Sequence, residues 1–330
     1  MSHASPLVLA LDFGGTKISA AAVVAGERDW LDLRRALSPE GADADSDYRI
    51  ATELAEEVLA GSAPAAVGVS FGGPVEAGSG TVKLSHHVPG WEGVALAREL
   101  EARFGAGVRV ENDGIAGALG EYRYGAGQGV NSLLYLTVST GVGGGIVAGG
   151  EIWRGADGMA GHVGHLRLEP DGPECVCGSR GCLESIAAGP AIAREARWRI
   201  EREPERARAL LELAGGAANL TARHVAEAAR GGDAMALELM ERAGSALGIA
   251  IGSAANLLNP DAILVGGGVS KAGEPLWGPL LRRARETAMP EVSLDVRPAG
   301  LGDDAPLWGA AALAYRLLDP STPAGRAVKG

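Results

Sequence analysis

The chain has 330 residues, enough for two domains with separate cores. Its formal net charge of −11 argues against a nucleic-acid-binding surface, because such a surface needs a basic patch. No apolar run reaches the roughly 20 residues of a membrane-spanning helix, and the N-terminal residues lack the basic region and cleavage site of a signal peptide. We therefore expect a globular protein that binds neither nucleic acid nor membranes.

The N-terminal part of the chain predicts a β-hairpin with a glycine turn. Residues 7–11 and 18–24 are apolar runs typical of buried strands. The turn between them reads Asp12-Phe13-Gly14-Gly15-Thr16-Lys17. Its glycines allow backbone N–H groups to approach a phosphate, while Asp12 can hold Mg²⁺ and Lys17 offers a positive charge. An ordinary hairpin turn is the alternative, since Gly-Gly turns are common.

Further strands and helices alternate along the first half of the chain, as in an α/β fold. We predict strands at 31–37, 66–71, 80–85 and 108–111, and helices at 45–59, 91–104 and 114–124. The strand at 66–71 leads into Gly72-Gly73, and the strand at 108–111 leads into Asn112-Asp113. A carboxylate at a helix N-terminus stays ionised, so Asp113 is placed to accept a proton from a substrate hydroxyl group. The alternative role of Asp113 is that of a helix N-cap.

Two more glycine-rich segments follow strands in the second half of the chain. After a predicted strand at 133–138, the chain reads Ser139-Thr140-Gly141-Val142-Gly143-Gly144-Gly145. This turn can wrap a phosphate, and a Rossmann site is disfavoured because a short strand at 146–147 follows in place of a helix. A predicted strand at 261–265 leads into Gly266-Gly267-Gly268, which permits close approach of a flat group such as adenine. We also predict helices through most of 187–252 and at 234–258, 280–288 and 305–318, with a strand at 293–296.

A cluster of cysteines and histidines lies between these glycine segments. Cys175, Cys177 and Cys182 fall within eight positions, and His162 and His165 precede them. Zn²⁺ is bound in a tetrahedron of N and S ligands, which one histidine and three cysteines supply. Four protein ligands close the site, so the metal would be structural and would hold a loop in place. The alternative is three reduced thiols without a ligand role. A metal site leaves no cysteine for disulfides, which suits the cytoplasm.

Taken together, these motifs resemble the ROK family of sugar kinases and repressors, which has the actin-like ATPase (ribonuclease H-like) fold. Residues 12–17 are similar to the first phosphate motif of the family, 140–145 to the second, and 264–268 to its adenosine segment. Residues 175–184 are similar to its zinc motif. The resemblance extends to Gly302-Asp303-Asp304-Ala305, before the last predicted helix. It implies a two-lobed α/β fold with a zinc-bound loop and an ATP-dependent sugar kinase.

The resemblance also implies roles for individual residues. Asp113 would be the general base and would contact the sugar, together with Gly73, Asn112 and Glu184. His165 would bind zinc through one ring nitrogen and sugar through the other. Contacts with ATP and Mg²⁺ are implied for Asp12, Gly14, Gly15, Thr16, Lys17, Thr140, Gly141, Gly266, Gly267 and Gly268. The implied zinc ligands are His165, Cys175, Cys177 and Cys182.

His162 departs from the family pattern, in which glutamate usually stands three residues before the zinc-binding histidine. Glutamate accepts hydrogen bonds from sugar hydroxyl groups, whereas a neutral histidine can donate one bond and accept another. A donor could serve an acetamido carbonyl group, and histidine here resembles some N-acetylmannosamine kinases of the family. We count His162 among the sugar-binding residues, with support of the loop as the alternative.

We predict transfer of the γ-phosphoryl group of ATP to the 6-hydroxyl group of a hexose, glucose first. N-acetylmannosamine or N-acetylglucosamine is the alternative acceptor, and polyphosphate stays open as a donor. A repressor would need a DNA-binding module before the first strand, which begins within ten residues of Met1. A silent sugar-binding protein would not need Asp113 and both phosphate turns.

For architecture, we expect a small lobe of residues 1–112 plus 311–330. The large lobe, 113–310, would hold the zinc loop and the dimerisation helices. ATP and sugar would meet in a cleft between the lobes, and closure would exclude water. The resemblance implies a homodimer.

Overall fold

The structure, a computed structural model, describes residues 6–85 and 88–318. By its internal contacts the chain forms two compact units. Among the described residues, unit 1 comprises 6–85, 88–131, 145–161 and 300–318, and unit 2 comprises 132–144 and 162–299. Of the helices in the described ranges, none combines the length and apolar character needed to cross a membrane.

The boundaries of these units differ from the predicted division after residue 112. Helix α3 (Asp113–Tyr124) groups with unit 1 because it packs along α10 (Ala305–Leu318). The stretch 319–330, predicted for the small lobe, lies outside the described residues.

Unit 1 is built on a five-stranded sheet with the order β3-β2-β1-β4-β7. Its strands are β1 (Leu7–Phe13), β2 (Lys17–Val24), β3 (Asp32–Leu37), β4 (Ala66–Phe71) and β7 (Gly107–Asn112). β1, β4 and β7 are parallel, whereas β2 and β3 continue the sheet in antiparallel pairs. The parallel register aligns Phe13 with Phe71, and Phe71 with Asn112. The first glycine turn, Gly72-Gly73 and Asp113 therefore follow strands at the same edge of the sheet.

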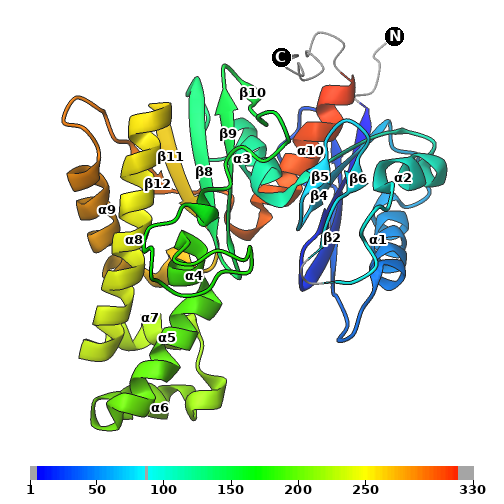
Figure 1. Cartoon of the computed structure of the whole chain (residues 1–330). Coiled ribbons are helices and arrows are strands. Elements are labelled where there is room, and N and C mark those ends of the chain that lie inside the picture. The colour runs from blue at the N-terminus through cyan, green and yellow to red at the C-terminus, as the bar shows by residue number, and fades with distance from the viewer. Residues whose placement is uncertain (1–5, 86–87, 319–330) are drawn as a thin grey trace. The chain divides into compact units, whose positions relative to one another are not determined.

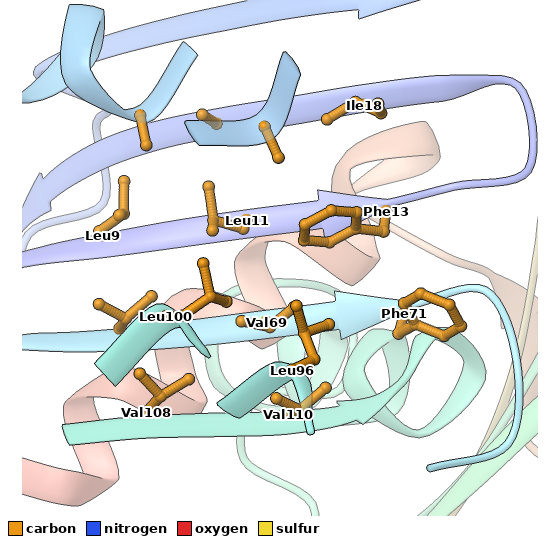
Figure 2. Packing of buried hydrophobic residues seen from close by; sticks show 14 of the residues in the cluster. Leu9, Leu11, Phe13, Ile18, Val69, Phe71, Leu96, Leu100, Val108 and Val110 are labelled. Atoms are coloured by element: carbon orange, nitrogen blue, oxygen red, sulfur yellow. The ribbon is translucent and has the colours of Figure 1, made fainter. Parts of the chain in front are cut away.

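Helices cover both faces of this sheet (Figure 1). Helices α1 (Ala44–Leu59) and α2 (Leu96–Phe104) pack on one face, and α10 packs on the other. Leu9 and Leu11 belong to the first core, whereas Val8 and Ala10 belong to the second, as the two-residue period of a strand requires. Figure 2 shows the first core, with the α2 leucines beside the β4 and β7 valines. Burial on both faces explains the uninterrupted apolar runs in the sequence.

Glycines allow α10 to pack directly on backbone. A Cβ atom added at Gly68 of β4 would collide with the Ala310 carbonyl oxygen, and one at Gly309 would collide with that of Ala116 in α3. These contacts fix α3, which begins at Asp113, against the helix that covers the sheet.

Unit 2 contains a parallel group of strands in the order β8-β11-β12, with β9 next to β8. The strands are β8 (Ser132–Val138), β9 (Val142–Ala148), β11 (Ala262–Gly266) and β12 (Val296–Pro298). β9 continues into unit 1, where β10 (Glu151–Ile152) pairs with its last residues. Another short ribbon of unit 1 pairs β5 (Val75–Glu76) with β6 (Thr81–Val82).

Six α-helices of unit 2 accompany these strands. They are α4 (Leu183–Ala187), α5 (Gly189–Arg202), α6 (Arg208–Ala214), α7 (Ala222–Arg230), α8 (Ala234–Leu258) and α9 (Glu274–Thr287). The short 3₁₀ turns of unit 2 are η1 (Val163–His165), η2 (Pro204–Ala207), η3 (Ala217–Asn219) and η4 (Val269–Ala272), whereas η5 (Gly302–Asp304) belongs to unit 1. α8 is the longest of these helices, and α9 packs along it (Figure 1).

Several predicted element boundaries are wrong. The helix predicted from Trp91 begins at Leu96, because Trp91 is a core residue of a turn that packs edge-on against Phe13 and Phe71. The strand predicted at 293–296 is replaced by β12, whose position is set by pairing with β11. The strand predicted at 80–85 shortens to β6, and the helix predicted at 280–288 begins six residues earlier, at Glu274.

Candidate active site and metal centre

The first glycine turn presents backbone to solvent at the end of β1. The Gly14 N–H donates to the Lys17 carbonyl oxygen (3.0 Å), and the Gly72 N–H donates to that of Phe13 (2.9 Å). A Cβ atom at Gly14 would lie 2.9 Å from the Lys17 oxygen, so glycine permits this tight turn. Gly15 and Thr16 are exposed at its tip. Exposed amides next to a lysine form a suitable place for a phosphate.

Asp12 lies buried just before this turn. Burial raises the pKa of its carboxyl group to about 7, and the negative charge of Asp113 acts in the same direction. A divalent cation favours the ionised form, and carboxylate oxygen is a ligand that Mg²⁺ prefers. Asp12 therefore fits the predicted Mg²⁺ site.

Asn112 and Asp113 are held together at the start of α3. The Asn112 side-chain oxygen accepts from the N–H groups of Gly114 (3.0 Å) and Ile115 (3.4 Å), so Asn112 is the helix N-cap. The alternative role of N-cap for Asp113 is therefore wrong. Asp113 accepts through Oδ1 from the Asn112 amide (2.9 Å) and the Gly114 N–H (2.8 Å). Both bonds favour an ionised carboxylate in a fixed orientation.

Gly73 belongs to the same cluster of unit 1. Its carbonyl oxygen accepts from the Asn112 amide nitrogen (3.2 Å), so the loop after β4 is tied to the start of α3. A Cβ atom at Gly73 would collide with the Leu84 carbonyl oxygen. The structure thus brings the predicted residues Gly73, Asn112 and Asp113 together.

A buried ion pair next to this cluster was missed from the sequence. Glu111 is 2% exposed and binds Arg154 through its carboxylate, with Oε2 at 2.6 Å from the arginine Nε. Burial raises the pKa of Glu111, and the charge of Arg154 opposes that change. The residues are 43 positions apart, and no sequence motif connects them.

Unit 2 contains a cavity of about 780 Å³, large enough for a nucleotide-sized ligand. Thr140 and Gly268, from the second and third glycine segments, both line it. Gly141, Gly266 and Gly267 are not among its lining residues. The backbone of Gly267 has φ 85°, and a Cβ there would collide with the Val138 carbonyl oxygen, so glycine is needed there for packing on β8.

The basic side chains of this cavity were also missed from the sequence. Of its described lining residues none is acidic, and four are basic: Arg197, Arg223, Arg230 and Lys271. Arg197, Arg223 and Arg230 lie on α5 and α7, within the stretch that the sequence predicted only as helical, and Lys271 lies on η4, for which the sequence predicted no element. An amphipathic helix pattern does not distinguish an arginine in a cavity from one in solvent.

The predicted metal ligands converge in unit 2. The ligand atoms of His165, Cys175, Cys177 and Cys182 lie within 4.8 Å of one another. Cys175 Sγ is 3.7 Å from His165 Nδ1, and Cys177 Sγ is 3.7 Å from Cys182 Sγ. A tetrahedral Zn²⁺ with Zn–S bonds of about 2.3 Å requires S···S separations of about 3.8 Å. The four residues therefore fit Zn²⁺, and His162 is not part of this set.

The thiols need a cation to be deprotonated together. Burial raises the pKa of Cys175 to about 12 and also raises that of Cys182. A hydrogen bond from the Ser179 backbone lowers the pKa of Cys177, which is exposed. Only thiolates bind zinc, so metal binding would release protons from the two buried cysteines.

Two further predicted residues flank the metal ligands. The rings of His162 and His165 are nearly parallel, with centroids 6.4 Å apart. Because Nδ1 of His165 faces the cysteines, Nε2 is the nitrogen that points elsewhere. Glu184 accepts through Oε2 from the Val142 N–H (2.9 Å), which ties the segment after Cys182 to the second glycine turn.

Comparison with known proteins covers nearly the whole chain. The family model described as the ROK family matches residues 8–316. The glucokinase of Thermotoga maritima is 36% identical over 308 residues, which are 93% of this chain and 96% of that protein. The glucokinase of Streptomyces coelicolor is 37% identical over 318 residues, 95% of this chain and 99% of that protein.

A solved structure agrees with this similarity. The crystal structure of a ROK family glucokinase from Streptomyces griseus, in complex with glucose and AMPPNP, matches with a TM-score of 0.82 and 36% identity. The match covers 93% of this chain and 99% of that chain. The predicted fold class, a two-domain α/β fold, is thereby confirmed.

Proposed function

This chain belongs to the ROK family, and we propose that it transfers the γ-phosphoryl group of ATP to the 6-hydroxyl group of glucose. The observation that carries this proposal is similarity to glucokinases along more than nine tenths of the chain. The cluster of Asp113, Asn112 and Gly73 at the carboxyl edge of the unit 1 sheet supports it.

Asp113 is the proposed general base. Its carboxylate oxygen is oriented by the Asn112 amide and the Gly114 N–H, and it stands in the first turn of α3, where the helix dipole favours negative charge. A carboxylate held in this way can accept the proton of the attacking hydroxyl group.

The glycine turns are the proposed phosphate sites. Gly14, Gly15, Thr16 and Lys17 offer amides and a positive charge in unit 1. In unit 2, Thr140 and Gly268 line the cavity that would take the nucleoside. Asp12 would hold Mg²⁺, which supplies charge stabilisation to the transferring phosphoryl group when bound. The turns themselves position the phosphates, and positioning is a large part of phosphoryl-transfer catalysis.

Several side chains are proposed sugar contacts. In unit 1 these are Gly73, Asn112 and Asp113, and in unit 2 they are His162, His165 and Glu184. His165 would use Nε2, because its Nδ1 faces the cysteines. Zn²⁺ held by this histidine and the three cysteines would keep the ring in place.

A second acceptor is favoured by one residue. His162 can donate a hydrogen bond to an acetamido carbonyl oxygen, which a glutamate cannot do. N-acetylmannosamine or N-acetylglucosamine is therefore the alternative acceptor.

A coupled assay of ATP consumption with glucose, mannose, N-acetylglucosamine and N-acetylmannosamine tests the proposal. We expect turnover of glucose to exceed that of both acetamido sugars. A preference for an acetamido sugar would replace glucose as the acceptor and assign His162 its donor role. Absence of turnover with all four sugars, in zinc-loaded protein with Mg²⁺, would contradict the kinase assignment.

We further propose a cytoplasmic homodimer. The three cysteines are reduced and suited to a metal, which fits a reducing compartment, and the dimer is implied by family resemblance. Light scattering coupled to gel filtration would give the mass of the particle, and a monomeric mass would refute the dimer.

A further inference from the structure

The second glycine turn, residues 139–142, is held by the segment that carries the metal ligands. The Val142 N–H donates to Glu184 Oε2 at 2.9 Å. The same oxygen lies over Gly141, where an added Cβ would approach it to 2.6 Å. Glu184 stands two residues after the metal ligand Cys182, in the first turn of α4. Its other oxygen lies 3.9 Å from Cys175 Sγ.

The opposite side of Val142 also touches this segment. Gly164, the neighbour of His165, packs so closely on the Val142 carbonyl group that an added Cβ would collide with its oxygen. Val142 therefore has its N–H bound by Glu184 and its carbonyl oxygen covered by Gly164. Both contacts come from residues one or two positions away from metal ligands.

A third contact fixes the beginning of the turn. The Gly189 N–H at the start of α5 donates to the Ser139 carbonyl oxygen (2.8 Å), and the Ser139 N–H donates to that of Gly141 (2.8 Å). The turn thus has little freedom as long as residues 162–189 keep their places. The placement of this segment depends in turn on the metal ligands within it.

We propose that Glu184 is a positioning residue. Through it, the segment that carries the metal ligands, residues 165–182, holds the 139–142 turn in the shape that binds the ATP phosphates. This inference rests on the proposed function of the turn, which is to bind the phosphates of ATP, the phosphoryl donor. It gives Glu184 a role in nucleotide affinity that does not depend on sugar, and it makes nucleotide affinity depend on a metal that touches no nucleotide.

The test is calorimetric titration of the full chain with ATP and Mg²⁺ in the absence of sugar. We expect Glu184→Ala to weaken ATP binding about tenfold, the effect of one lost hydrogen bond between a charged group and a backbone amide. Glu184→Gln keeps an oxygen acceptor for the Val142 N–H and should retain most of the affinity. The control is Val176→Ala, an exposed position between two cysteines, which should bind ATP as the wild type does.

Removal of the metal provides the second arm. Wild-type protein should lose ATP affinity when its zinc is removed. Glu184→Ala should lose less affinity on zinc removal, because it already lacks the hydrogen bond between Glu184 and the Val142 N–H. Circular dichroism checks that each sample is folded. Equal ATP affinity in wild type and Glu184→Ala would overturn the inference. Failure of wild-type protein to bind ATP at all would instead overturn the donor function on which it rests.

Discussion

At the residue scale, Asp113 is the side chain on which turnover should depend most. Substitution by asparagine keeps a side-chain oxygen for the Gly114 N–H but removes the charge that accepts a proton. We expect Asp113→Asn to lower kcat with glucose by at least about 10²-fold. The coupled assay measures this loss, and a thermal unfolding curve like that of the wild type would show that the fold is kept. Asp45→Asn, at an exposed position of α1, is the control, and a loss below tenfold in Asp113→Asn would argue against the base.

Asp12 makes the stability of the protein depend on pH. Its pKa is about 7 in the fold against an ordinary value of 3.8. Between these values the folded state holds a proton that the unfolded state has released, so the free energy of unfolding falls as pH rises. The contribution of Asp12 is therefore fully present below its ordinary pKa and is lost as pH rises through about 7.

Asp12→Asn should remove this pH dependence. With no Mg²⁺ or ATP added, the free energy of unfolding should fall between pH 4 and pH 8 by up to about 4 kcal/mol more in the wild type than in the variant. Its kinase activity should fall, because the proposed Mg²⁺ ligand is gone. Urea unfolding at several pH values measures this difference. Parallel pH curves for the two proteins would contradict the raised pKa.

At the element scale, local sequence patterns predicted which turns and clusters form better than they predicted where helices and strands begin and end. The hairpin of β1 and β2 and the His165 and cysteine cluster were predictable, because glycine turns and metal ligands are close in sequence. The start of α2 and the position of β12 were not, because packing of Trp91 and pairing with β11 decide them. Glu111 and Arg154 meet only through the fold. Contacts over long sequence distances are what a single sequence does not reveal.

The packing of α8 on α9 can be tested at one glycine. A Cβ at Gly248 would collide with the Leu280 carbonyl oxygen and lie 2.7 Å from Arg283 Cβ. Alanine favours a helix over glycine by about 1 kcal/mol, but overpacking against backbone costs about 1–3 kcal/mol or more. We therefore expect Gly248→Ala to lower the free energy of unfolding in urea. Ser253→Ala, on the exposed side of α8, should change it by less than about 0.5 kcal/mol, and a stabilised Gly248→Ala would contradict this packing.

At the scale of the whole molecule, charge is distributed unevenly. The chain has a formal net charge of −11, yet the described lining of the unit 2 cavity has four basic side chains and no acidic one. An acidic protein repels an anionic nucleotide at long range, so local positive charge must offset that repulsion at the donor site. This contrast supports an anionic ligand for the cavity independently of the glycine motifs.

Arg223 is an exposed cavity residue suited to test this balance. We expect Arg223→Gln to raise the KM for ATP about fivefold, while kcat and the KM for glucose stay unchanged, because the lost charge acts on the donor alone. The difference in KM for ATP between variant and wild type should become smaller at high salt, where charges are screened. Arg208→Gln, at an exposed site on α6 outside the cavity lining, removes the same charge and is the matched control. Equal effects of the two variants would mean that net charge, and not the cavity, sets the affinity for ATP.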